Sequence, residues 1–179
     1  MKVIKKIAKA ELSQFFYSPI AWLVLIVFTL QSAIAFVNNY ETQLLNFESG
    51  SGVLPLTERI YTNTWNGMLA QIRQYLYLYI PLLTMGLISK EKANGSIKLL
   101  FSSPISNAQI VMGKYISILI LGLILTSVLI IYALFGYFTI DQFDMPYVLS
   151  AILGIYLLIS AYAAIGLFMS TLTSYQVVA

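Results

Sequence analysis

The chain has 179 residues, of which 59% are hydrophobic and 9% are charged, with a net charge of +3. Soluble domains carry about 25% charged residues, so this composition excludes an ordinary soluble domain and predicts an integral membrane protein. The absence of cysteine and histidine excludes the usual zinc sites, thiol nucleophiles, disulfides and histidine general bases. Separate apolar runs of about 20 residues predict an all-α polytopic fold rather than a β-barrel. The basic residues lie mainly beside these runs, where membrane topology explains them, so we expect no nucleic-acid partner.

Residues 1–18 are predicted to form an amphipathic helix that lies in the membrane interface. Its apolar residues recur at helical spacing, and four lysines occupy a separate face: Lys2, Lys5, Lys6 and Lys9. We interpret these lysines as an interfacial anchor for membrane lipids. The alternative is a basic segment that only orients the first span. A cleavable signal peptide is disfavoured because both the basic and the apolar region are too long for one.

The first predicted span covers residues 19–38, with Ser18 as its N-cap and Pro19 in its first turn. Residues 39–66 are polar and predict a loop with at most short helical pieces. Their acidic balance, with three glutamates against Arg59, fits the outer side of the membrane. A loop this long is often functional, but a flexible linker is an equal alternative.

The second predicted span covers residues 67–89. Arg73 precedes its apolar part, and counting back from Lys90 places this arginine near the outer interface, where its long side chain can reach the headgroups. We therefore interpret Arg73 as a further interfacial anchor, with a substrate contact as the alternative. Pro81 predicts a kink.

Residues 90–106 form the strongly charged segment between apolar runs. The positive-inside rule places it, and with it the N-terminus, in the cytoplasm. Asn94-Gly95 predicts a turn, Ile97, Leu100 and Phe101 share one face of a short helix, and Pro104 ends that helix. No P-loop follows, because Tyr115 stands after Gly113-Lys114 and Ala108 stands where the first glycine would be needed. Nucleotide hydrolysis would have to come from another chain.

The third and fourth predicted spans cover residues 107–139 and 146–171. Ser106 opens the third span as part of a capping box, and Lys114 lies one to two turns inside it, so its first turns should stand in the cytoplasm or the headgroups. Two spacings of four predict close helix packing in the fourth span; they involve Ser150 with Gly154, and Tyr162, Gly166 and Ser170. The last residues resemble the start of another apolar run, so we expect the chain to be truncated.

Residues 85–114 resemble the cytoplasmic segment of ABC-2 type transporter permeases. The resemblance rests on Ser89-Lys90-Glu91-Lys92, Asn94-Gly95-Ser96-Ile97, Ser103-Pro104-Ile105-Ser106 and Gly113-Lys114. It is closest to the permeases associated with gliding motility and nitrous-oxide reduction, and residues 166–173 are similar to the end of the fourth span in that subgroup. Gly86, Ser96 and Lys98 depart from the family pattern.

The resemblance implies a six-span fold of which the fifth and sixth spans are missing here. It implies an exporter in the bacterial inner membrane, working as a homodimer or with a paired permease subunit. A separate ABC ATPase subunit would bind ATP and Mg²⁺, and this chain would hold no cofactor and have no enzyme activity of its own. The implied ATPase-coupling residues are Lys90, Glu91, Lys92, Gly95, Ile97, Leu100, Phe101, Pro104, Gly113 and Lys114. The alternative function is a non-transporting membrane scaffold or immunity-type protein.

Overall fold

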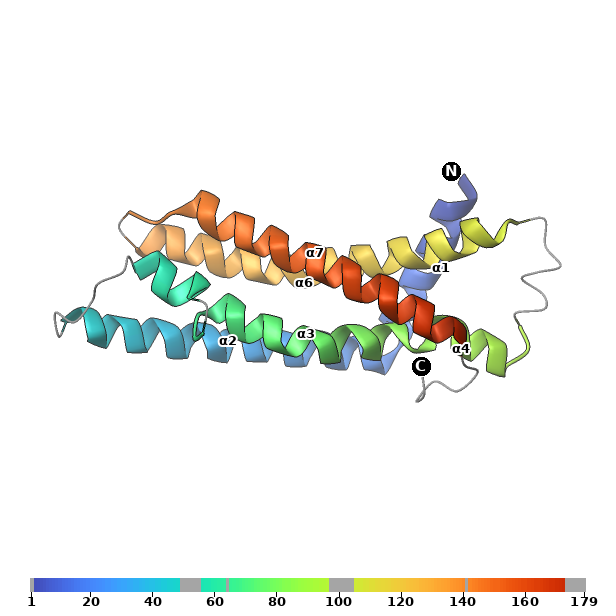
Figure 1. The fold of residues 1–179 in the computed structure, drawn as a ribbon, viewed down its shortest axis with the longest axis horizontal. Helices are drawn as coiled ribbons and strands as arrows, with labels where there is room; N and C mark the ends of the chain where they lie inside the picture. The colour runs from blue at the N-terminus through green and yellow to red at the C-terminus, as the bar shows by residue number, and fades with distance from the viewer. Residues whose placement is uncertain (1, 49–55, 64, 97–104, 141, 173–179) are drawn as a thin grey trace. The chain divides into compact units, whose positions relative to one another are not determined.

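The computed structural model describes residues 2–48, 56–63, 65–96, 105–140 and 142–172 (Figure 1). These residues are almost entirely helical and contain no strand, which confirms the predicted all-α fold. The elements are α1 (Lys2–Tyr17), α2 (Pro19–Glu48), the π-helix η1 (Glu58–Thr62), α3 (Met68–Thr84), α4 (Gly86–Ala93), α6 (Asn107–Thr139) and α7 (Met145–Leu172).

Within the described ranges, three helical segments are long and apolar enough to cross a membrane: Pro19–Gln43, Asn107–Thr139 and Met145–Leu172. They correspond to the predicted first, third and fourth spans. Helix α3 takes the place of the predicted second span and has 17 residues, at the lower limit of the roughly 17–25 residues that a span needs. The protein is thus a multi-pass membrane protein, and the four-span arrangement stays a prediction.

The chain forms two compact units. The first contains Met1–Val24, Tyr77–Leu123 and Leu158–Ala179, and the second contains Leu25–Leu76 and Ile124–Leu157. Each unit has its own apolar core. The core of the first unit includes Ala8, Phe15, Ala21, Leu83, Leu87, Ile118, Leu121, Ile159, Ala163 and Leu167, and that of the second includes Phe28, Phe36, Tyr61, Ile72, Leu76, Leu125, Leu129, Ala133, Val148 and Ile152.

Two helix starts follow the predicted local signals, and a third has a cap that was not predicted. Helix α2 begins at Pro19 and α6 begins at Asn107, where the Ser106 hydroxyl accepts a hydrogen bond from the Gln109 N–H at 3.4 Å. At the start of α7, a carboxylate oxygen of Asp144 accepts a hydrogen bond from the Tyr147 N–H at 3.2 Å. The Asp144 carboxylate thereby satisfies one N–H group of the first turn of α7, whereas the Gln109 N–H also donates to the Ser106 carbonyl oxygen at 2.9 Å.

The prediction of a loop over residues 39–66 is wrong for its first part, because α2 continues to Glu48. Polar side chains in this last part of α2 donate to carbonyl oxygens one turn earlier in the helix. Asn39 Nδ2 donates to the Ala35 carbonyl oxygen and Thr42 Oγ1 donates to that of Asn38, both at 2.7 Å. A helix needs backbone hydrogen bonds rather than apolar residues, so polarity marked the end of the apolar stretch and not the end of the helix.

In the second unit, η1 packs against the neighbouring helices through the buried side chain of Tyr61. The Tyr61 hydroxyl donates to the Tyr132 carbonyl oxygen at 2.7 Å. The Tyr61 ring meets that of Phe143 edge-on with centroids 5.4 Å apart, and lies 5.9 Å from that of Phe36. These contacts attach the segment after α2 to α6.

In the first unit, the continuous helix predicted over residues 67–89 is interrupted at Met85, between α3 and α4. The hydroxyl of Ser170 on α7 fills this interruption. It accepts hydrogen bonds from the N–H groups of Ile88 and Ser89, both at 3.1 Å, and donates to the Met85 carbonyl oxygen at 3.0 Å. Figure 1 shows the end of α7 passing beside α4. The inserted hydroxyl replaces helical hydrogen bonds, which accounts for the break.

Of the two spacings in α7 that predicted close packing, the one with Gly166 and Ser170 lies in a buried contact and the one with Ser150 and Gly154 does not. Gly166 is buried, and a Cβ added there would stand 2.9 Å from the Cβ of Thr84, so only glycine permits this approach. Gly154 instead is exposed and has no described atom near its Cβ position, and Ser150 is exposed as well. Close packing in the described part of the chain therefore involves Gly166 and Ser170, and not the pair Ser150 and Gly154.

Candidate functional site

The side chain of Lys114 is at the centre of a buried ionic cluster in the first unit. Its Nζ lies 2.6 Å from Oε1 of Glu11 on α1 and 2.7 Å from Oε1 of Glu91 on α4. It also donates to the carbonyl oxygen of Leu87 at 2.8 Å. An ammonium group has three donors, and these acceptors use all of them. One lysine on α6 thereby joins α1, α4 and its own helix.

This cluster is shielded from solvent to different degrees. The Lys114 side chain is 1% exposed, that of Glu11 10% and that of Glu91 23%. Removing charges from water is unfavourable unless each one is paired and hydrogen-bonded. The cluster meets this requirement, but it holds two carboxylates and one ammonium, so one negative charge remains in excess on its Glu91 side.

Each member of the cluster is positioned by its own helix. Glu11 lies on the buried face of α1, between Ala8 and Phe15, at helical spacing. On α6, the start set by Ser106 places Lys114 on the same buried side as Ile110 and Ile118. The position of this start of α6 in the cytoplasm or the headgroups stays a prediction. Within the protein, Lys114 is buried against α1 and α4.

Glu11 is the residue that sequence reasoning missed. The signal was present, since Glu11 is the only acidic residue before Glu41 and shares the helical face of Ile4, Ile7 and Ala8. A carboxylate on an apolar helical face requires a buried cation as its partner. Glu11 therefore predicts that a lysine inside an apolar span is buried next to it. The pattern could not identify which lysine it was.

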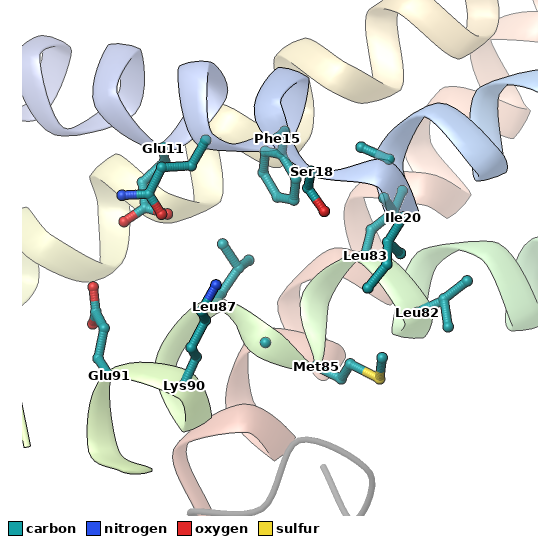
Figure 2. Close-up of a pocket in the computed structure, with 13 residues that line it drawn as sticks. Glu11, Phe15, Ser18, Ile20, Leu82, Leu83, Met85, Leu87, Lys90 and Glu91 are labelled. Atoms are coloured by element: carbon teal, nitrogen blue, oxygen red, sulfur yellow. The ribbon is translucent and has the colours of Figure 1, made fainter. Parts of the chain in front are cut away.

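A cavity of about 180 Å³ lies next to the cluster (Figure 2). It is lined by α1, the start of α2, the end of α3 and α4. Glu11, Lys90 and Glu91 line one end of it, while Ile20, Leu82, Leu83 and Met85 line the other (Figure 2). A second, more open groove of about 590 Å³ shares Lys90 and Glu91 and continues along Tyr17, Asn94 and Ser96.

The remaining predicted coupling residues that the structure describes lie on α4, in the turn after it and on α6. Lys90 is exposed, and Lys92 donates from Nζ to the Thr171 carbonyl oxygen at the end of α7. Gly95 forms the predicted turn with a φ of +70°, a conformation that favours glycine. Gly113 is buried, and a Cβ there would stand 2.6 Å from Cγ2 of Ile7, so α1 and α6 pack closely.

Four predicted coupling residues, Ile97, Leu100, Phe101 and Pro104, lie outside the described residues, as does the short helix predicted for them. The five predicted anchors are all exposed: Lys2, Lys5, Lys6 and Lys9 on α1, and Arg73 on α3 in the second unit. Exposure is compatible with lipid contact for each of them, and their anchoring role stays a prediction.

The arrangement connects three helices of the first unit through one side chain. Within the described ranges, no group of three acidic, histidine or cysteine side chains could hold a metal ion. The Lys114 ammonium is already satisfied by its three acceptors. A displacement of α4 would pull on Glu91 and therefore on Lys114, and through that lysine on α1 and α6.

Comparison with known proteins identifies the family. Residues 5–179 match the sequence model of a family described as "ABC-2 family transporter protein". No curated protein and no solved structure matched the chain. The match includes most of α1, the three residues of the ionic cluster and the three long apolar helices. The chain therefore belongs to the ABC-2 family of transporter proteins.

Proposed function

We propose that this chain is the permease subunit of an ATP-binding cassette exporter. A separate ABC ATPase would bind ATP and Mg²⁺ and hydrolyse the nucleotide, and this chain would carry no cofactor. The protein would lie in the bacterial cytoplasmic membrane with its N-terminus inside, and would act with a second permease subunit, either identical or paired. Family membership supports the transport role in general, and the direction of transport is part of the proposal.

The observation that carries this proposal is the connection of α4 to two other helices through Lys114. The ATPase would contact α4 and the segment 90–106. Closure of the ATPase would then displace α4, and the Glu91–Lys114–Glu11 cluster would transmit that displacement to α6 and α1. The close approach of Gly113 to Ile7 supports movement of α1 with α6 as one piece.

The open groove beside Lys90, Asn94 and Ser96 is the proposed contact surface for the ATPase. Most of the residues that line it are polar or charged, and they lie on α4, in the turn after it and at the end of α1, on the side where the positive-inside rule places the cytoplasm. A polar surface fits a subunit that binds and releases during a cycle, because transient interfaces are more polar than permanent ones.

Reconstitution with a candidate ABC ATPase in lipid vesicles tests the proposal. The wild-type chain should bind the ATPase and raise its rate of ATP hydrolysis. Glu91→Lys should weaken both effects, because it reverses the charge beside Lys114. The matched control is Glu41→Lys, which makes the same change at an exposed position of α2 in the second unit.

If the ATPase binds the wild-type chain without any change in hydrolysis, the scaffold function is favoured over the permease function. If Glu91→Lys and Glu41→Lys both behave as the wild type does, the assigned coupling route through α4 is wrong.

A further inference from the structure

The cavity next to the ionic cluster has the polarity of a lipid-binding site. It is formed entirely within the first unit, by α1, the α1–α2 junction, the end of α3 and α4. Its two ends differ: Glu11, Lys90 and Glu91 are at one end and aliphatic side chains are at the other (Figure 2). A ligand that fits both ends must be amphipathic.

The polar and apolar ends of the cavity follow each other in the same order as the headgroup and the acyl chains of a membrane lipid. Its apolar end is built by Ile20 at the start of the first membrane-crossing segment and by Leu82 and Leu83 of α3. Its polar end is built by the charged residues of α1 and α4. The junction residue Ser18 lines the cavity between them (Figure 2). Since α2 enters the apolar region from Pro19 onward, the polar end lies at headgroup depth and the apolar end lies toward the acyl chains.

The charges at the polar end are those that complement a zwitterion. Lys114 neutralises one of the two glutamates, so one negative charge remains on the pair. Lys90 supplies a separate positive charge, and the described residues give it no ion-pair partner. A ligand with one ammonium and one phosphate group can place the ammonium against the carboxylates and the phosphate against Lys90.

We propose that this cavity binds the headgroup of a phosphatidylethanolamine-type lipid. The primary ammonium donates hydrogen bonds to Glu91 and Glu11, the phosphate accepts from Lys90, and the first methylene groups of the acyl chains lie along Leu82, Leu83 and Ile20. The volume of about 180 Å³ corresponds to roughly six water molecules at ~30 Å³ each. This is room for a headgroup and the first methylene groups, with the rest of the chains extending outside.

The same chemistry discriminates between lipids. A choline headgroup has a quaternary nitrogen without N–H donors, so it cannot make the hydrogen bonds to the carboxylates. A glycerol headgroup leaves the phosphate as the only charge, and the excess carboxylate charge then repels it. The site should therefore prefer phosphatidylethanolamine over phosphatidylcholine and phosphatidylglycerol.

The experiment measures lipids that the purified chain retains, without any ATPase. The chain is reconstituted in nanodiscs with equal amounts of the three lipids, extracted into detergent, and examined by native mass spectrometry. The wild type should retain phosphatidylethanolamine in preference to the other two. Lys90→Gln should weaken its retention about tenfold, as expected for the loss of a hydrogen bond between charged groups. Glu41→Gln, which removes a charge at an exposed position of α2 in the second unit, should not.

A second variant pair tests the apolar end. Leu83 is 5% exposed and lines the cavity, whereas Leu78 on the same helix is 55% exposed and does not line it. Leu83→Trp should fill the cavity and abolish preferential retention, and Leu78→Trp should retain the lipid as the wild type does. Circular dichroism checks that Leu83→Trp folds, and Lys90→Gln tests the proposal independently because Lys90 is exposed.

Equal retention of all three lipids, or preferential retention of phosphatidylglycerol, would overturn the proposal. So would equal retention by Leu83→Trp and Leu78→Trp when both fold. Because the measurement involves neither the ATPase nor transport, its failure would leave the permease function untouched, and a failure to couple with an ATPase would leave the lipid site untouched.

Discussion

The ammonium nitrogen of Lys114 lies 2.6 Å from Oε1 of Glu11, although the two residues are 103 positions apart in the sequence. Glu11 belongs to the amphipathic helix α1, and Lys114 belongs to the long apolar helix α6. The contact therefore attaches the N-terminal helix to an apolar helix from a distant part of the chain. Both side chains are buried, so each depends on the other for its charge balance.

Replacing Lys114 by methionine should destabilise the protein strongly. The change leaves Glu11 and Glu91 close together without a cation, and breaking a buried pair in this way costs about 3–5 kcal/mol. The midpoint of thermal unfolding in lipid nanodiscs, followed by intrinsic tryptophan fluorescence, measures the effect. Lys9→Met is the matched control, because Lys9 is exposed. Equal midpoints for the two variants would show that the cluster does not stabilise the fold.

A double-mutant cycle separates the Glu11–Lys114 pair from its surroundings. Glu11→Gln removes one carboxylate, and its combination with Lys114→Met removes both partners of one contact. We expect the double variant to be more stable than the sum of the single effects predicts, by about 0.5–3 kcal/mol, since residues in one ionic cluster are coupled. Strict additivity of the two changes would contradict a direct interaction.

The local features of the fold were predictable because each depends on residues close in sequence. Pro19 and Ser106 mark helix starts, and Asn94-Gly95 marks a turn in which Gly95 adopts a positive φ. The basic, exposed face of α1 followed from periodicity alone. The apolar runs of about 20 residues predicted the three long apolar helices, and with them the membrane class of the protein.

The long-range features were not predictable in the same way. Periodicity places Glu11 on a buried face but does not select Lys114 over other lysines as its partner, because selection depends on how three helices pack. The break at Met85 likewise arises from Ser170, whose hydroxyl comes from 85 positions away. The sequence around Met85 contains Pro81 and Gly86 as hints of bending, but neither indicates the contact with Ser170. Helix packing decides both features, and it is a property of the whole unit.

Replacing Ser170 by alanine should loosen the start of α4. The change removes the acceptor of the Ile88 and Ser89 N–H groups and the donor to the Met85 carbonyl oxygen. Ser170 is fully buried, so water cannot easily replace these bonds, and we expect a loss of about 1–3 kcal/mol. Hydrogen–deuterium exchange should become faster at the amides of Ile88 and Ser89.

The control for this prediction is Ser150→Ala on the same helix. The Ser150 hydroxyl is exposed and bonds only to its own helix, at the Tyr147 carbonyl oxygen. This variant should leave exchange at Ile88 and Ser89 unchanged. If Ser170→Ala also leaves that exchange unchanged, the hydroxyl is not what caps α4.

Gly166→Ala should destabilise the protein, although alanine favours helices. The added Cβ would meet Thr84 on α3 at 2.9 Å from its Cβ and closer still to its hydroxyl. Crowding of this kind costs about 1–3 kcal/mol. The double variant with Thr84→Ala should recover part of the loss in unfolding midpoint, because it removes the hydroxyl and the methyl group.

Gly154→Ala provides the comparison, since no described atom lies near its Cβ position. It should be neutral or raise the unfolding midpoint, through a helix propensity gain of up to about 1 kcal/mol. A loss at Gly154 as large as that at Gly166 would mean that the contact with Thr84 is not the cause.

The stability of the second unit should fall at alkaline pH through Tyr61. Burial raises the pKa of the Tyr61 hydroxyl, which lies in η1 outside the long apolar helices. An acid with a raised pKa in the folded state contributes its full stabilisation below the unfolded pKa of about 10 and loses it as the pH rises toward the folded value. Tyr61→Phe carries no titrating hydroxyl, so this variant should lack the loss at alkaline pH.

At neutral pH, Tyr61→Phe should be less stable than the wild type by about 0.5–1.5 kcal/mol, because the hydrogen bond to the Tyr132 carbonyl oxygen is missing. Unfolding midpoints of the two proteins measured from pH 8 upward should therefore converge above about pH 10, whereas a constant difference would show that the Tyr61 phenolate forms in the folded state without penalty.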